Sequence, residues 1–236
     1  MSSNQHTAAA IEVRGLTKFY VDNPALRNVN LQLAPGQIVG LVGANGCGKT
    51  TLLKILAGVI AEYDGKVRML GNRPGIESKR QVSFLPDAEL VPRRMRVQSA
   101  MDAYADFFAD FDKEKCRQMV ESMGLNPKMR GSEMSKGMRE KLRLALVMSR
   151  NAEIYLLDEP MGGIDPASRE AILHTIIGNY REESLVVVST HQVSDVEQIL
   201  DRALIMKTGE IITNLSLDEL REEYGFGLDQ YLRRVY

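Results

Sequence analysis

The sequence lacks the charge imbalance and the cysteine content that mark two large classes of protein. Its 236 residues carry 30 Lys and Arg against 31 Asp and Glu, which gives a net charge of -1. A protein that follows a nucleic-acid backbone needs a clustered basic excess, so we expect no nucleic-acid partner. The two cysteines, Cys47 and Cys116, cannot define a disulfide framework, and we expect a reducing compartment.

Long apolar runs are also missing. The strongest, such as Leu185-Val186-Val187-Val188, are far shorter than the roughly 20 residues that cross a bilayer. Residues 1–10 have neither a basic start nor an apolar centre, so they do not resemble a signal peptide. If the chain serves a membrane process, we expect another chain to supply the membrane part.

A glycine-rich motif of the form G-x-x-x-x-G-K-[ST] lies between a predicted strand at 37–42 and a helix that opens at Lys49. Glycines let backbone N–H groups crowd an anion, and the helix N-terminus adds a positive dipole end. We expect Lys49 to reach the β- and γ-phosphates of a nucleotide, and the Thr50 hydroxyl to hold Mg²⁺. The predicted phosphate-binding residues are Gly43, Ala44, Asn45, Gly46, Cys47, Gly48, Lys49, Thr50 and Thr51.

A second motif follows a predicted buried strand at 152–157, which delivers two carboxylates, Asp158 and Glu159, at its end. In a doubly wound sheet, ligands bind beyond the carboxyl ends of the strands. We therefore expect Asp158 to hold Mg²⁺, mostly through water. Glu159 is expected to accept a proton from the attacking water, or to orient it.

Strand and helix signals alternate along the chain, which predicts an α/β fold around a parallel sheet. The segment 10–33 has the alternation of half-exposed antiparallel strands. Between 87 and 150 the strand signals stop, and helical spacing predicts helices at 97–111, 113–123 and 136–150. This part holds eight methionines, which either fill an ordinary core or form an adaptable surface for a partner.

The order of the motifs resembles the ATP-binding subunits of ABC transporters, over residues 11–236. The resemblance implies a P-loop NTPase (RecA-like) core with a flanking antiparallel β-subdomain and an inserted α-helical lobe. It divides the single domain, 1–236, into a nucleotide-binding core with the β-subdomain (11–86 and 151–213), a helical subdomain (87–150) and a short C-terminal tail (214–236).

The same resemblance implies roles for residues around the nucleotide. Tyr20 matches the aromatic residue that stacks on adenine, although Phe19 is an alternative. His191 matches the switch histidine, which hydrogen-bonds the γ-phosphate and the attacking water. Asp87 stands where the family has a glutamine that links Mg²⁺ to the helical lobe, and Glu89 competes with it for this role; Asp87 also fits a simple turn residue.

Two further segments resemble those that contact the other subunit of a dimer. Ser135 and Gly137 match the signature segment at 134–138, whose helix N-terminus favours an anion, whereas Lys136 departs from the usual glycine. Ser135 also fits a plain helix N-cap. Asp165 matches the D-loop aspartate and, before Pro166, also fits an N-cap.

The resemblance implies ATP and Mg²⁺ as cofactors, a second ATP-binding subunit, and separately encoded integral membrane transporter subunits. The nearest branch is that of the bacterial ABC-2 type exporters, and the expected location is the cytoplasmic face of the cell membrane. Two alternatives remain open: a soluble ABC ATPase without a transport role, and the weakly hydrolysing, ATP-gated half of a heterodimer.

Overall fold

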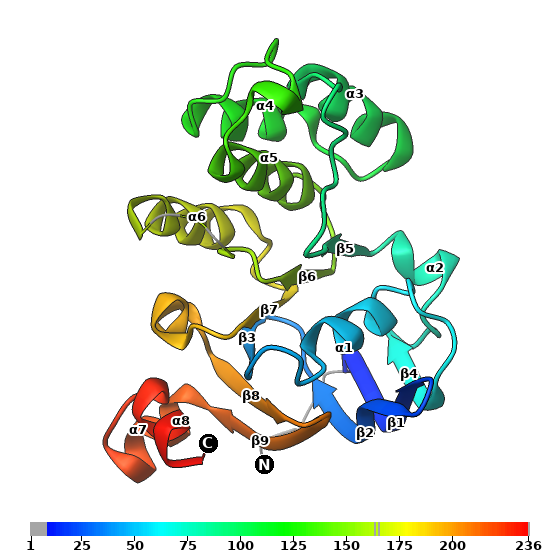
Figure 1. The fold of residues 1–236 in the computed structure, drawn as a ribbon, viewed down its shortest axis with the longest axis vertical. Coiled ribbons are helices and arrows are strands. Elements are labelled where there is room, and N and C mark those ends of the chain that lie inside the picture. Colours follow the sequence, from blue (N-terminus) through cyan, green and yellow to red (C-terminus); the bar gives the residue numbers. More distant parts are fainter. Residues whose placement is uncertain (1–8, 163, 165, 236) are drawn as a thin grey trace, which may run out of the picture.

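The computed structural model describes residues 9–162, 164 and 166–235, which form two sheets and the helices around them (Figure 1). The strands are β1 (Ile11–Tyr20), β2 (Asn23–Leu33), β3 (Gln37–Val42), β4 (Asp64–Met69), β5 (Val82–Leu85), β6 (Ile154–Asp158), β7 (Leu185–Thr190), β8 (Arg202–Lys207) and β9 (Glu210–Ser216). The helices are α1 (Lys49–Leu56), α2 (Ile76–Lys79), α3 (Val97–Phe107), α4 (Lys113–Ser122), α5 (Lys136–Met148), α6 (Pro166–Asn179), α7 (Leu217–Tyr224) and α8 (Leu228–Val235).

The larger sheet has the order β5-β6-β7-β3-β8-β9. Its strands are parallel except for β9, which runs antiparallel to β8. Every residue of β6 and β7 is buried, because both faces of a parallel sheet are covered. β7 lies inside the sheet between β6 and β3, and β8 and β9 form a hairpin about Thr208-Gly209.

The smaller sheet, β2-β1-β4, is antiparallel and lies at the lower right of Figure 1. Its strands alternate between buried and exposed residues, as the sequence predicts for 10–33. The two sheets together confirm the predicted fold class, a parallel core flanked by an antiparallel sheet and a group of helices.

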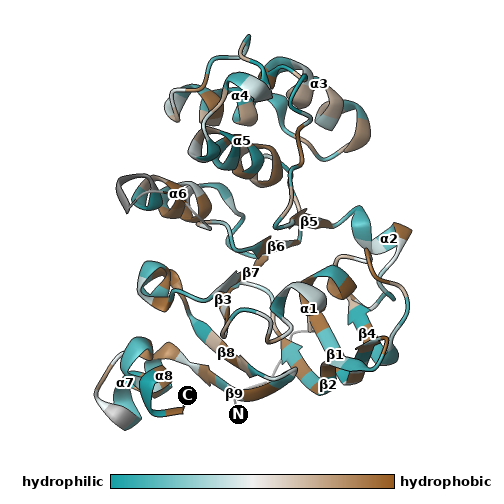
Figure 2. Cartoon of the chain, viewed as in Figure 1, coloured by the Kyte–Doolittle hydropathy of each residue, from teal (hydrophilic) through white to brown (hydrophobic). Residues whose placement is uncertain are grey.

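Side chains of the parallel sheet point into two hydrophobic cores. Ile38 and Val42 of β3 pack in a core shared with α3, α4, α5 and α6, whereas Val39 and Leu41 pack with α1 and the antiparallel sheet. Burial of each such side chain stabilises the fold by roughly 1.5–3 kcal/mol. Figure 2 shows the matching brown bands on strands and inner helix faces, with teal over loops and outer turns.

The segment between β5 and β6 forms the group of helices α3, α4 and α5, set apart at the top of Figure 1. The predicted helices at 113–123 and 136–150 are one or two residues too long, and the one at 97–111 is four residues too long. That helix ends early because Phe108 takes an extended conformation, although the aromatic spacing continues to Phe111.

The methionines of this segment belong to a core. Met101, Met119, Met134 and Met148 are buried, and Met95, Met123, Met129 and Met138 pack against the same cluster. The structure therefore confirms core filling, the first of the two interpretations.

The segment predicted as a short C-terminal tail (214–236) contains helices α7 and α8. A capping box opens α7: Ser216 Oγ accepts from Glu219 N at 3.0 Å, and Glu219 Oε2 accepts from Ser216 N at 2.8 Å. The sequence interpretation missed α8, which docks through buried Leu228. Among the described residues, no helix has both the length and the apolar character of a membrane span.

Candidate active site

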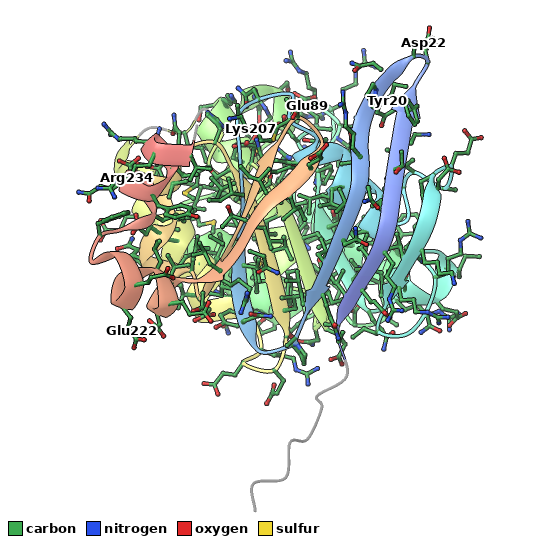
Figure 3. The ribbon with its side chains drawn as sticks, turned by 90° about the horizontal axis from the view of Figure 1, so that it is seen from below. Tyr20, Asp22, Glu89, Lys207, Glu222 and Arg234 are labelled. Carbon is green, nitrogen blue, oxygen red and sulfur yellow. The ribbon has the colours of Figure 1, made fainter. Side chains whose placement is uncertain are left out.

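A cavity of about 770 Å³ opens where β3, β6 and β7 end. Such an edge is the usual ligand site of an α/β sheet. The cavity is lined by Tyr20, Asn23, Pro24, Ala25, Arg27, Asn45, Gly46, Gly48, Lys49, Thr50, Thr51, Asp87, Lys136, Glu159, Gly162, His191, Thr208 and Gly209. Figure 3 shows the β1–β2 hairpin, with Tyr20 near its tip, on the same side of the molecule as Glu89 and Lys207.

The glycine-rich loop needs glycine for conformation at Gly46 and for space at Gly48. Gly46 has φ +80° and Gly48 has φ +111°, a region that other residues rarely adopt. A Cβ on Gly48 would also lie 2.5 Å from the Ala25 carbonyl oxygen. The loop then leads into α1 at Lys49, so the helix N-terminus faces the cavity, as an anion site requires.

Lys49 is buried at the centre of this loop, with an exposed fraction of 5%. Its Nζ donates to Gly43 O at 2.7 Å and to Ala44 O at 3.2 Å, and lies 3.4 Å from Glu159 Oε1. Lys49 therefore connects the phosphate loop to the acidic end of β6. Gly43 and Ala44 contribute carbonyl groups to the lysine and do not line the cavity.

Glu159 is held in an unusual backbone conformation, with φ +48°. Its N–H donates to Ser189 Oγ at 3.0 Å, and its carbonyl accepts from Gly162 N at 2.9 Å. Left-handed conformations of bulky residues are uncommon and cluster at functional sites. Here the turn brings the carboxylate to Lys49.

His191 completes this arrangement from the loop that follows β7. Its Nδ1–H donates to Glu159 Oε2 at 2.9 Å. One carboxylate therefore lies between the Lys49 ammonium and the His191 ring, at the mouth of the phosphate loop. A carboxylate held in this way can orient a water molecule or accept its proton.

Asp158 ends β6 and is almost completely buried, with an exposed fraction of 1%. Its Oδ1 accepts from Ser189 Oγ at 2.6 Å, while its buried Oδ2 has no hydrogen-bond partner in the described residues. A buried carboxylate oxygen without a partner is costly, and a hydrated Mg²⁺ would satisfy it. Thr50, which lines the cavity, supplies the hydroxyl that the predicted Mg²⁺ site needs.

The thiol of Cys47 lies on the inner side of the loop. The residue is buried in the core beneath the antiparallel sheet and does not line the cavity. Burial raises the pKa of this thiol. Its N–H donates to Ala44 O at 3.3 Å, a contact within the loop itself.

The structure places the aromatic and acidic candidates differently. Tyr20, half exposed, lines the cavity, whereas Phe19 lines a separate groove beside Tyr63. Asp87 is exposed and lines the cavity, but Glu89 does not. Tyr20 rather than Phe19, and Asp87 rather than Glu89, therefore line the cavity at the phosphate loop.

The signature segment lies at the start of α5. Ser135 is its N-cap, and its Oγ accepts from Met138 N at 3.2 Å. Ser135 and Gly137 do not line the cavity of their own chain, whereas Lys136 does. Asp165, the predicted D-loop residue, lies outside the described residues.

Two residues of the site escaped the sequence interpretation. Ser189 connects Asp158 to the Glu159 backbone, and Arg27 of β2 adds a cation to the cavity. The signal for Ser189 was available: it is a polar residue that follows the apolar run of its strand and lies two positions before His191. Nothing in the sequence pattern distinguishes Arg27 from an exposed strand residue.

Comparison with known proteins identifies the family. Residues 26–162 match the model of the ABC transporter family. An ABC transporter ATP-binding protein of Methanocaldococcus jannaschii is 32% identical over 86% of this chain and 76% of its own. The zinc transport system ATP-binding protein TroB of Treponema pallidum is 30% identical over 95% of this chain and 88% of its own.

A solved structure, described as the ATP-binding subunit of an ABC transporter, has the same fold. It superposes with a TM-score of 0.85 and 23% identity, and covers 96% of this chain and 100% of its own. The family match covers the phosphate loop, the helical segment and the Asp158-Glu159 pair. The chain therefore belongs to the ABC transporter family, and its relatives there are ATP-binding proteins.

Proposed function

We propose that this chain binds ATP together with Mg²⁺ in the cavity at the phosphate loop, and that Glu159 and His191 promote its hydrolysis. Phosphoryl transfer to water depends mainly on positioning and on neutralising charge. When ATP binds, Lys49 would exchange its contacts with Gly43 O, Ala44 O and Glu159 for the β- and γ-phosphates. That exchange frees the Glu159 carboxylate for water.

The bound Mg²⁺ supplies charge neutralisation between the phosphates. Thr50 and Asp158 are the residues that would hold it, with Asp87 at the exposed side of the cavity. Tyr20 would lie against adenine through its ring face. His191 would keep the Glu159 carboxylate oriented through the Nδ1 contact of 2.9 Å.

The site is open toward solvent, and Ser135 and Gly137 lie outside it. In the proposed assembly, the start of α5 of a second subunit closes the γ-phosphate side of the site, since a helix N-terminus favours an anion. The D-loop residue Asp165 would face the partner as well. We place the dimer at the inner face of the cell membrane, where it drives separately encoded membrane subunits.

One observation carries this proposal: the Glu159 carboxylate lies between Lys49 and His191 at the phosphate loop. Replacing Glu159→Gln keeps the size and the hydrogen-bonding ability but removes the base. Turnover should fall by ~10²–10⁴-fold, while nucleotide binding persists. Lys49→Ala should instead abolish tight ATP binding. Near-normal turnover of the Gln variant would rule out Glu159 as the base.

A second candidate function is the weakly hydrolysing half of a heterodimer. It rests on Lys136, an exposed cation where the family has glycine. If Lys136 only weakens closure, Lys136→Gly should preserve or raise the ATPase rate of the purified chain. A dead Gly variant would show that the lysine has a role of its own.

A further inference from the structure

Two buried arginines, one in α5 and one just after it, connect this helix to the two ends of β5. Arg143 has an exposed fraction of 6% and Arg150 of 3%. Arg143 Nη2 donates to the carbonyl oxygen of Pro86, directly after β5. Arg150 Nη1 donates to Val82 O at 2.8 Å, at the first residue of β5.

The two arginines differ in what lies beside them. Pro86 immediately precedes Asp87, which lines the nucleotide cavity. Arg150 Nη2 contacts Lys79 O and Arg80 O at the end of α2, and its Nε pairs with Asp110, so its neighbours lie away from the cavity. Of the two arginines, only Arg143 therefore bonds to a residue that is next to a predicted site residue.

Arg143 also belongs to the helix that begins with the signature segment. It lies seven positions after Lys136, about 10 Å along a helix at 1.5 Å per residue. Its Nη1 pairs with Glu140 on the same helix, and both side chains are largely buried. Asp87 and the helix start of 135–137 are thus linked through one guanidinium group and one carbonyl group.

The burial of Arg143 carries a cost in folding stability. Its Nε is buried and has no hydrogen-bond partner in the part of the chain that the structure describes. Burying a charge is costly, and a buried donor without a partner adds to that cost. A residue retained in such an environment calls for another explanation.

We propose that Arg143 is a positioning residue that couples Asp87 in a chain's own nucleotide site to the helix start that this chain offers to its partner. The inference rests on the proposed function of both segments. When Asp87 responds to Mg²⁺ and the γ-phosphate, the Pro86 carbonyl moves with it, and Arg143 passes that displacement to α5. ATP in one site then adjusts the surface that closes the other.

The test compares three substitutions in the Glu159→Gln background, in which ATP-bound dimers should accumulate. Arg143→Met removes both contacts of the guanidinium, and Glu140→Gln removes only the ion pair. Arg150→Met is the matched control, because it removes a buried arginine from the other end of β5. Binding of a fluorescent ATP analogue measures the isolated site, and sedimentation at increasing ATP·Mg²⁺ measures dimerisation.

The Arg143→Met chain should bind nucleotide within about twofold of its parent, yet need at least roughly tenfold more ATP for half-maximal dimerisation, since a hydrogen bond to a charged group is lost. Glu140→Gln should dimerise like the parent, because the Pro86 contact remains. Arg150→Met should lower the Tm without raising the ATP requirement. Parental dimerisation by a folded Arg143→Met chain, or an equal defect in Arg150→Met, would overturn the proposal.

If the Arg143→Met chain does not fold, the same dimerisation measurement on Arg143→Lys tests the proposal. It keeps the charge beside Glu140 but loses the planar fork that reaches two partners, so a smaller rise in the ATP requirement is expected. A folded Lys variant with parental dimerisation also contradicts the coupling. Failure of the proposed function looks different: the Glu159→Gln parent itself would then bind no ATP or form no dimer.

Discussion

Ser189 is the residue that joins the two acidic groups of the site. Its hydroxyl donates to Asp158 Oδ1 and accepts from Glu159 N, and it is completely buried. It holds Asp158 Oδ1, which leaves Oδ2 without a hydrogen-bond partner in the described residues, and it holds the turn that carries Glu159. A single hydroxyl thus contacts both the residue that we propose to hold Mg²⁺ and the residue that we propose to act on water.

Replacing Ser189→Ala should lower the free energy of unfolding by about 1–3 kcal/mol, because Asp158 Oδ1 and Glu159 N lose a buried partner. It should also raise the Mg²⁺ concentration needed for half-maximal ATPase activity. Ser184→Ala is the matched control, since Ser184 is equally buried and donates to Ala152 O at 2.8 Å, away from the site. Equal Mg²⁺ dependence in both variants would remove Ser189 from the metal site.

Both thiols should resist labelling in the native protein. Burial raises the pKa of Cys47 above its usual value and that of Cys116 to about 11, so neither thiol ionises appreciably at pH 8. A thiol-reactive chromogenic disulfide should therefore react slowly with the folded chain and with both cysteines in denaturant. Rapid loss of ATP binding on labelling of native protein would show that the Cys47 side chain is accessible from the loop.

At the residue scale, the sequence predicted groups whose type and spacing the chemistry demands, such as Lys49, Asp158 and Glu159. It could not predict contacts between distant segments. Ser189 lies 31 residues from Asp158, and the choice between Tyr20 and Phe19 depends on the direction of a strand end. The roles of Asp87, Ser135 and Gly137 stay predictions.

At the scale of elements, α8 is positioned by a contact close to the segment that follows His191. Leu228 N donates to Glu197 Oε1 at 2.8 Å, and α8 packs against the short helix at 193–195 that follows His191. The sequence could not predict this docking, because α8 is short and Glu197 is 31 residues away. By contrast, the capping box of α7 is local, because Ser216 and Glu219 are three positions apart.

Gly227→Ala tests this docking. A Cβ at Gly227 would lie 2.4 Å from Glu197 Oε1, so the carboxylate must move and release Leu228 N. We expect a loss of about 1–3 kcal/mol in the free energy of unfolding, measured by denaturant titration. Gly178→Ala in α6 is the control: nothing lies within 4 Å of its Cβ, and alanine favours the helix by up to about 1 kcal/mol. Equal stability of the two variants would show that the contact does not matter.

At the scale of the whole molecule, the chain carries two segments that we propose to complete one nucleotide site in a dimer, and they lie in different places. The phosphate loop, Glu159 and His191 line the cavity, while Ser135 and Gly137 lie outside it at the start of α5. The motif order predicted this fold class, because each motif is tied to a strand end or helix start.

The dependence of ATPase activity on protein concentration tests most directly whether the site is completed by a second subunit. The rate per chain, measured at saturating ATP·Mg²⁺ over a hundredfold range of concentration, should rise steeply at low concentration and level off as dimers form. Glu159→Gln should reduce it by ~10²–10⁴-fold at every concentration. A constant rate per chain, from a protein that sediments as a monomer throughout, would contradict the account.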